Sequence, residues 1–282
     1  MRTIKRIYKA EYRPIANLIT YSPLPSRNLE MIDPFIFLNH HGPQNYGPDN
    51  SGLPFGPHPH RGMETVTIII DGDIAHKDSG GSDSVIESGG VQWMTAGKGL
   101  IHSEVSSENF KRKGGRLEIL QLWVNLPSRL KMTAPKYKGL QKDEIPVTVL
   151  DEGKVKAQVI SGIINDSVGA FESMTGITLS TIFLENEGVL KLKVPKEHNI
   201  LCYIIKGEVK IHGDVIEKLH LIEFNDDDEQ VYIEAREKSI ILFGHAAPFN
   251  EPVVFGGPFV MNTEEEIQQA YEDYKAGKFE PD

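Results

Sequence analysis

Short apolar runs that alternate with polar residues occupy most of the chain. Glycine, aspartate and asparagine interrupt these runs about every 8 to 12 residues, which is typical of an all-β sandwich or barrel. The run METVTIII predicts a strand from Met63 to Ile70. It meets Asp71-Gly72, a dipeptide suited to the positive φ angles of a tight hairpin turn, and a second strand begins near Ile74. The same texture recurs in LEILQLWVNLP, KAQVISGII, GITLSTIFLE, VLKLKVP, NILCYIIKGEVKIHG, QVYIEA and SIILFG.

A change of pattern between Pro127 and Pro146 divides the chain. This stretch lacks alternating apolar residues and contains KMTAPKYKGLQKDE, so we interpret it as a connection between two domains. The strand, turn glycine and strand of TIIIDGDIAHKD resemble those of CYIIKGEVKIHG, which favours two similar halves. The predicted units are an N-terminal β domain, a linker, a C-terminal β domain and a tail, at residues 1–130, 131–148, 149–247 and 248–282.

One helix is predicted in the tail. Thr263 and Glu266 form a capping box at its start, and Gly277 fits its end. Its apolar face comprises Ile267, Ala270, Tyr271 and Tyr274. Because so short a helix is marginal alone, we expect that face to pack on the β domains.

The composition limits the location and the partners. A chain of 282 residues is long enough for two cores, and 30 basic against 40 acidic residues leave a formal charge of -10, which disfavours direct binding to nucleic acid or to an anionic membrane surface. We interpret the dense basic cluster as a solvated loop; it comprises Lys111, Arg112, Lys113 and Arg116. The single Cys202 is expected to be a buried small hydrophobe. The N-terminal segment has no apolar run of signal-peptide or membrane-helix length, so we expect a cytoplasmic location.

Two segments each place metal-ligand side chains two residues apart, His58 and His60 in one and His102 and Glu104 in the other. Side chains alternate between the faces of a strand, so each pair points to one side and the two pairs can converge on one ion. Three imidazoles and one carboxylate suit Fe(II), Mn, Co, Ni, Cu or Zn, and are too rich in nitrogen for Ca or Mg. An octahedral metal would keep two open positions for substrate or dioxygen.

The other candidates have weaker patterns. Glu64 has the same strand parity as His60, so it competes with Glu104 as the carboxylate ligand or lies just outside the ligand set. His40 and His41 fit a place at the rim of the site or in a turn. The remaining histidines lack a partner arrangement and are interpreted as surface or hydrogen-bonded structural residues; they are His76, His198, His212, His220 and His245.

Several strings carry a family resemblance. Gly52, His58-x-His60 and Glu64 resemble the first signature of the cupin superfamily. The stretches HPHRGMETV, GGVQWMTAGKGLIHSE, DPFIFLNHHGP and EPVVFGGPFVMNT resemble the hallmark stretches of pirins, which are bicupins. The likeness runs from one end of the chain to the other.

The resemblance implies two cupin-type β-barrels and a short C-terminal helix, with metal in the N-terminal barrel alone. The metal, iron in pirins, would be held by His58, His60, His102 and Glu104, and the C-terminal barrel would bind none. Pirins are described as iron-dependent quercetin 2,3-dioxygenases. In that activity a flavonol and dioxygen are the substrates and Glu104 or Glu64 would be the base. They are also described as redox-sensitive iron-binding proteins that regulate transcription or metabolism through protein partners.

Overall fold

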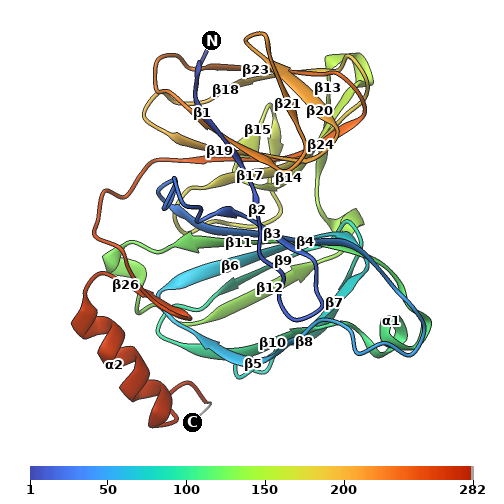
Figure 1. Ribbon diagram of the computed structural model, residues 1–282. Coiled ribbons are helices and arrows are strands. Elements are labelled where there is room, and N and C mark those ends of the chain that lie inside the picture. The colour runs from blue at the N-terminus through green and yellow to red at the C-terminus, as the bar shows by residue number, and fades with distance from the viewer. Residues whose placement is uncertain (281–282) are drawn as a thin grey trace. The chain divides into compact units, whose positions relative to one another are not determined.

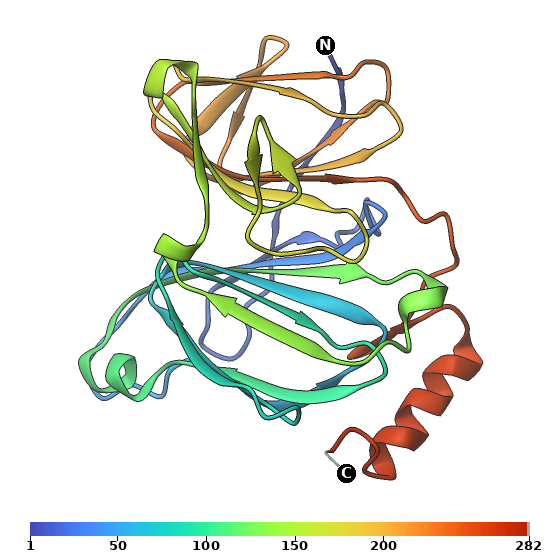
Figure 2. The same ribbon diagram turned by 180° about the vertical axis from the view of Figure 1, so that it is seen from behind.

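β-Strands make up most of the regular structure, and the computed structural model describes residues 1–280. The chain forms two units, and each has one seven-stranded and one four-stranded sheet as its main layers (Figures 1 and 2). The N-terminal barrel comprises Tyr12–Tyr21, Phe35–Lys142 and the segment from Phe249 onward. The C-terminal barrel comprises Met1–Glu11, Ser22–Pro34 and Asp143–Pro248.

The sheets of the N-terminal barrel have the strand orders β12-β9-β6-β11-β4-β3-β2 and β5-β10-β7-β8. Their bounds are β2 Glu11–Tyr12, β3 Thr20–Leu24, β4 Phe35–Tyr46, β5 Phe55–His60, β6 Met63–Asp71, β7 Asp73–Asp78, β8 Asp83–Glu87, β9 Val91–Thr95, β10 Leu100–Val105, β11 Gly115–Asn125 and β12 Lys136–Leu140. The tail adds β25 Val254–Gly256, β26 Phe259–Met261 and the helix α2 Glu264–Lys275.

The sheets of the C-terminal barrel have the strand orders β1-β22-β19-β24-β17-β14-β13 and β18-β23-β20-β21. Their bounds are β1 Ile4–Lys9, β13 Val147–Leu150, β14 Val155–Ser161, β17 Thr178–Leu184, β18 Val189–Lys193, β19 Asn199–Lys206, β20 Glu208–Ile211, β21 Asp214–Glu217, β22 His220–Phe224, β23 Gln230–Ala235 and β24 Ser239–Ala246. A small hairpin joins β15 Ile163–Ile164 to β16 Ser167–Val168, and 3-10 turns lie at Ser128–Leu130, Lys142–Glu144 and Asp151–Gly153.

The two barrels share one order of strands. Position by position, β5-β10-β7-β8 corresponds to β18-β23-β20-β21, and the seven-stranded sheets correspond in the same way. β6 and β7, which carry TIIIDGDIAHKD, therefore match β19 and β20, which carry CYIIKGEVKIHG. The predicted all-β fold of two cupin-type barrels with a short C-terminal helix is confirmed.

The turn at Asp71-Gly72 differs from the prediction. Gly72 has the expected positive φ, +89°, but β6 pairs with β9 and β11 whereas β7 pairs with β8 and β10. The chain therefore passes from one sheet to the other at this point instead of folding back as a hairpin. Local turn chemistry specifies the φ angle, and the closure of the barrel decides which strands then pair.

The strand pairing also differs from the predicted domain boundaries. β12 lies inside the predicted linker 131–148, yet it pairs with β9 of the N-terminal barrel. β1 lies inside the predicted N-terminal domain 1–130, yet it pairs with β22 of the C-terminal barrel. The tail groups with the N-terminal barrel. Pairing between strands far apart in sequence leaves no local signal, which is why a change in composition did not locate these boundaries.

The interiors of the two barrels differ. Apolar side chains fill the C-terminal barrel, among them Val159, Ile182, Cys202, Ile204 and Phe243. Cys202 is fully buried, as predicted, and burial raises the pKa of its thiol to about 12. One apolar cluster of the N-terminal barrel includes Leu18, Ile69, Ile74, Phe110 and Ile119. The same barrel also buries polar side chains, among them His60, His102 and Glu104, and there the candidate site lies.

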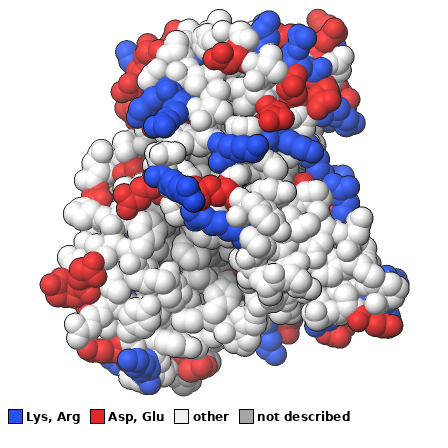
Figure 3. Space-filling model, viewed as in Figure 1, with Lys and Arg blue, Asp and Glu red and all other residues white. Residues whose placement is uncertain are grey.

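The basic cluster belongs to a short helix and not to a loop. α1, Glu108–Lys113, carries Lys111, Arg112 and Lys113, while Arg116 is the second residue of β11 and pairs with Asp71. Figure 3 shows both signs of charge on one face of the molecule, with uncharged side chains covering most of the N-terminal barrel in that view. No helix within residues 1–280 is long and apolar enough to cross a membrane.

The predicted C-terminal helix is present as α2. Thr263 Oγ1 accepts a hydrogen bond from the Glu266 backbone N–H, and the Glu266 carboxylate accepts one from the Thr263 backbone N–H, so the capping box is complete. Ile267 and Ala270 are buried against the tail strands, and the Tyr271 ring lies 4.9 Å from that of Phe259.

Thr263→Ala is expected to lower the free energy of unfolding of the N-terminal barrel by about 1 kcal/mol, because the first turn of α2 loses a side-chain acceptor. Urea denaturation followed by tryptophan fluorescence would measure the change. Thr263→Ser, which keeps the acceptor, is the matched control. Equal midpoints for the alanine and serine variants would contradict the prediction.

Candidate metal centre

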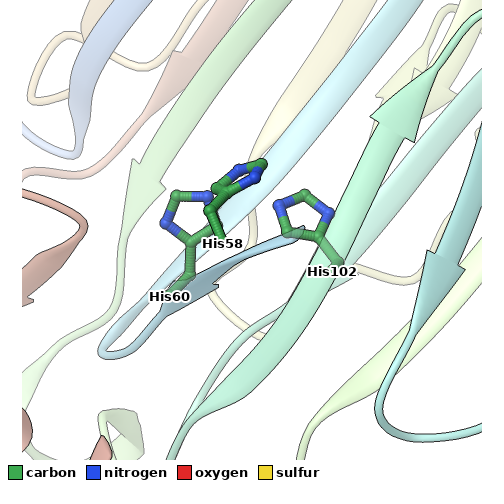
Figure 4. A group of neighbouring side chains, drawn as sticks. All are labelled: His58, His60 and His102. Carbon is green, nitrogen blue, oxygen red and sulfur yellow. The ribbon is translucent and has the colours of Figure 1, made fainter. Parts of the chain in front are cut away.

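Three histidines meet inside the N-terminal barrel. β5 supplies His58 and His60, and the antiparallel β10 supplies His102 directly opposite His58. Their rings point toward one another in Figure 4, with centroids separated by 4.4 Å for His58 and His102, 4.9 Å for His58 and His60, and 5.0 Å for His60 and His102. One ring nitrogen from each lies within 4.8 Å of the others. The structure thus brings three of the four predicted ligands together.

The hydrogen bonds of these rings fix where their lone pairs lie. Nδ1 of His58 donates to the Gly56 carbonyl at 2.8 Å, and Nδ1 of His60 donates to the Pro258 carbonyl at 3.0 Å, so the lone pair of each is on Nε2. Nε2 of His60 and both ring nitrogens of His102 are buried and find no partner among residues 1–280. Buried polar atoms without partners are costly. These orphaned nitrogens therefore fit a bound metal.

Burial also favours the neutral form of the rings. Desolvation, with the nearby His58, lowers the pKa of His60 to about 3. Desolvation and the neighbouring histidines hold the pKa of His102 well below its ordinary value. Metals bind the neutral imidazole. Both rings are consequently ready to bind a cation at neutral pH.

Glu104 lies beside His102 on β10 and is 1% exposed. Its Oε1 accepts hydrogen bonds from Thr67 Oγ1 at 2.8 Å and from Gln92 Nε2, and its Oε2 accepts one from Gln121 Nε2 at 2.5 Å. The carboxylate forms a second cluster with His76 and His102, in which the ligand atoms again lie within 4.8 Å of one another. Glu104 is therefore held at the edge of the three-histidine cluster by three donors.

Glu64 does not face the histidines. Thr67 on β6 reaches Glu104, and alternation along the strand places Glu64 on the opposite face of β6. Its Oε1 accepts a hydrogen bond from Thr95 Oγ1 at 2.7 Å, and burial raises its pKa. The parity argument is wrong because β5 ends at His60 and the chain bends at Gly62, which has φ +80°. Glu104 is left as the carboxylate next to the histidines.

Among the residues of the site that sequence reasoning missed are His76 and Tyr137. Nε2 of His76 donates to Asp78 Oδ2 at 2.9 Å, and its ring lies 5.4 Å from that of His102. Tyr137 stacks on His76 with centroids 3.9 Å apart and planes 10° apart. The spacing of His76 and Asp78, again two residues apart, was a usable signal. Tyr137 had none, because it lies in the predicted linker.

Two stacked aromatic rings border the histidines. Trp123 on β11 and Phe37 on β4 have centroids 4.5 Å apart, and Trp123 lies edge-on to His60 at 5.1 Å. Both aromatic side chains are partly exposed. They offer a flat apolar surface beside the metal ligands.

The other histidines take structural positions. His40 and His41 lie within β4 and not in a turn; His40 pairs with Glu118, and His41 bonds to Thr20 Oγ1 at 2.9 Å. In the C-terminal barrel, Nδ1 of His198 lies 2.9 Å from Nδ1 of His245, a pairing that the sequence did not reveal. His212 and His220 bond to backbone carbonyls, as predicted.

The tail fixes the bend that follows His60. The Val260 N–H donates a hydrogen bond to the Arg61 carbonyl. The Val260 carbonyl oxygen also lies so close to Gly62 that a Cβ atom added there would be 2.0 Å from it. Nζ of Lys131 bonds to the carbonyls of Gly62 and Val260 at 3.0 and 2.8 Å, and burial lowers its pKa to about 8. The Arg61 guanidinium pairs with Asp273 of α2 at 2.8 Å. Segments about 200 residues apart in sequence thus position one ligand.

Comparison with known proteins agrees with this architecture. The Pirin family model matches residues 17–124, and the model of the pirin C-terminal cupin domain matches residues 179–280. A Pseudomonas aeruginosa protein named "Putative quercetin 2,3-dioxygenase PA2418" is 35% identical over 266 residues, which is 94% of this chain and 92% of that protein.

Two solved structures add to the comparison. The crystal structure of a quercetin 2,3-dioxygenase from Acinetobacter baumannii is 35% identical and superposes with a TM-score of 0.93, covering 99% of this chain and 98% of that one. The bacterial pirin YhhW from Escherichia coli, crystallised in complex with nickel(II), is 20% identical and has the same fold, with a TM-score of 0.69 over 86% of this chain and 99% of that one. Nickel is bound by YhhW, and a cluster of side chains that could hold a metal ion is present in this chain. The chain belongs to the pirin family.

Proposed function

We propose that the protein is an iron-dependent dioxygenase that opens the heterocycle of a flavonol such as quercetin. The observation that carries the proposal is the convergence of His58, His60 and His102, with buried nitrogens of His60 and His102 that have no partner in the described part of the chain. The names of the Pseudomonas and Acinetobacter relatives support the same reaction. In that reaction one flavonol and one dioxygen give a ring-opened ester and carbon monoxide.

The three histidines would hold the metal, and Glu104 would be the fourth ligand. This donor set suits iron(II) and also Mn, Co, Ni, Cu or Zn. When bound, the metal would supply Lewis acidity toward the flavonol oxygens and the redox chemistry that dioxygen requires.

The side chains around the ligands would bind and prepare the substrate. The partly exposed rings of Trp123 and Phe37 can stack on a flat flavonol, since offset aromatic rings attract one another. Glu104 clusters with His76 and His102, so it is the group that would accept the proton of the flavonol hydroxyl. The donors from Thr67, Gln92 and Gln121 orient it for that transfer.

Protein loaded with iron under anaerobic conditions and mixed with quercetin in air should bleach the flavonol absorbance, with dioxygen consumed in equal amount. Glu104→Gln keeps the shape of the side chain but lacks the negative charge and the basic oxygen, so turnover is expected to fall by about 100-fold or more. Glu185→Gln, at an exposed carboxylate of the C-terminal barrel, is the control and should retain full turnover.

The absence of turnover with iron, manganese, cobalt, nickel and copper would overturn the enzymatic proposal. The alternative, a redox-sensitive iron-binding protein that regulates transcription or metabolism through protein partners, would then be tested by recovering bound proteins with the ferrous and the ferric forms. Equal recovery of bound proteins with the ferrous and the ferric forms would contradict a redox-sensitive interaction.

A further inference from the structure

The Tyr137 hydroxyl has two hydrogen-bond partners, Ser84 Oγ at 2.6 Å and Gln92 Oε1 at 3.1 Å. An amide carbonyl oxygen can only accept, so the single hydroxyl proton of Tyr137 goes to Gln92. Ser84 must then donate to Tyr137. The polarity of both bonds is therefore fixed.

The Glu104 carboxylate, which can only accept, requires this orientation of the Gln92 amide. With Oε1 occupied by Tyr137, the amide presents Nε2 to Glu104 Oε1, and the two are hydrogen-bonded. A flipped amide would present its oxygen to the Glu104 carboxylate, which repels it, so the carboxylate selects the orientation in which Nε2 faces Glu104. By donating to Oε1, Tyr137 anchors the far side of the amide that supports Glu104.

Tyr137 is itself held in place. Its ring stacks on His76, and Asp78 fixes the orientation of the His76 ring. Burial, with the charges of Glu104 and Asp78, raises the pKa of Tyr137 to about 12, so it keeps its proton as a donor at neutral pH. β12 supplies Tyr137, β9 supplies Gln92 and β10 supplies Glu104, so the chain of contacts exists only when the two sheets of the barrel are assembled.

We propose that Tyr137 is a positioning residue for Glu104 and acts through Gln92. The inference rests on the proposed role of Glu104 as a metal ligand. Its consequence is that loss of one hydroxyl group, two hydrogen bonds away from the carboxylate, weakens metal binding. Removal of groups that orient metal ligands typically costs about 10- to 100-fold in affinity.

The test is a double-mutant cycle of Tyr137→Phe and Gln92→Met, read out as cobalt(II) affinity by competition with a chelator and as the ligand-field spectrum of bound cobalt. Tyr137→Phe keeps the stacked ring, and Gln92→Met keeps the side-chain volume. Each variant is expected to bind cobalt about 10-fold more weakly, and the double variant no more weakly than Gln92→Met alone. Tyr46→Phe is the matched control, because the Tyr46 hydroxyl is buried in the same barrel without a partner among residues 1–280.

Effects that multiply in the double variant, or a Tyr137→Phe protein that binds cobalt like Tyr46→Phe, would overturn the inference. Thermal unfolding of the metal-free variants separates a general loss of structure from the specific effect, since the inference requires similar melting temperatures. The cobalt measurement needs no flavonol, so failure of the dioxygenase proposal leaves it intact. If Glu104→Gln changes neither the affinity nor the spectrum, Glu104 is not at the metal and the inference falls.

Discussion

His60→Ala is expected to lower the affinity for a divalent transition metal by more than about 100-fold, because it removes a ligand outright and even removal of an orienting group costs about 10- to 100-fold. In the unchanged protein, Nδ1 of His60 donates to the Pro258 carbonyl, so the buried Nε2 is the ring nitrogen that is free to bind the metal. Elemental analysis after loading with iron(II) or nickel(II) and gel filtration should show about one metal per chain for the unchanged protein and almost none for the variant.

The matched control for this experiment is His220→Ala. His220 lies in the C-terminal barrel, where its ring bonds to the carbonyls of Glu217 and Lys218, so the variant should load metal normally. Full metal content in the His60 variant would contradict the assignment of the site to His58, His60 and His102. Equal loss in both variants would point to general instability.

The second large effect is expected for Arg61→Met, which should lower the free energy of unfolding by about 3 kcal/mol. Arg61 is 4% exposed, and its guanidinium donates to the Lys98 carbonyl at 2.7 Å and to Asp273 at 2.8 Å. Methionine fills most of the volume but leaves both acceptors without their donor. Urea denaturation of the metal-free proteins would measure the loss.

The same ion pair makes a prediction about pH. Hydrogen bonds from Lys278 and then Arg61 lower the pKa of Asp273 to about 2, below its value in the unfolded chain. The unfolded state therefore binds more protons between pH 4 and pH 2, and the stabilisation, complete above about pH 5, is lost as the pH falls through that window. The difference in the free energy of unfolding between the unchanged protein and Arg61→Met should therefore become smaller as the pH falls from 4 to 2.

Arg236→Met is the control for both measurements. Arg236 is half exposed and lies 3.9 Å from Glu234, so its removal is expected to change the stability by less than about 0.5 kcal/mol. If Arg61→Met were as stable as Arg236→Met at neutral pH, the ion pair between Arg61 and Asp273 would not stabilise the N-terminal barrel as proposed.

Features with a local cause were predictable from the sequence. The capping box at Thr263 and Glu266 depends on neighbouring residues of one helix turn, and the alternation of side chains along a single strand pairs His58 with His60 and His102 with Glu104. The short runs of alternating apolar and polar residues predicted the all-β fold, because this alternation is also a property of each strand by itself. The resemblance to pirins then predicted the two barrels.

The tertiary structure alone decided the features that depend on long-range pairing. Parity could not be carried from His60 to Glu64, because the bend at Gly62 turns the chain onto another sheet. The position of Tyr137 in the site follows from the pairing of β12 with β9. The tautomer of His60 follows from the Pro258 carbonyl, 198 residues away. The sequence by itself determined which side chains could bind a metal, and barrel closure determined which of them meet, because contacts between distant strands leave no trace in local spacing.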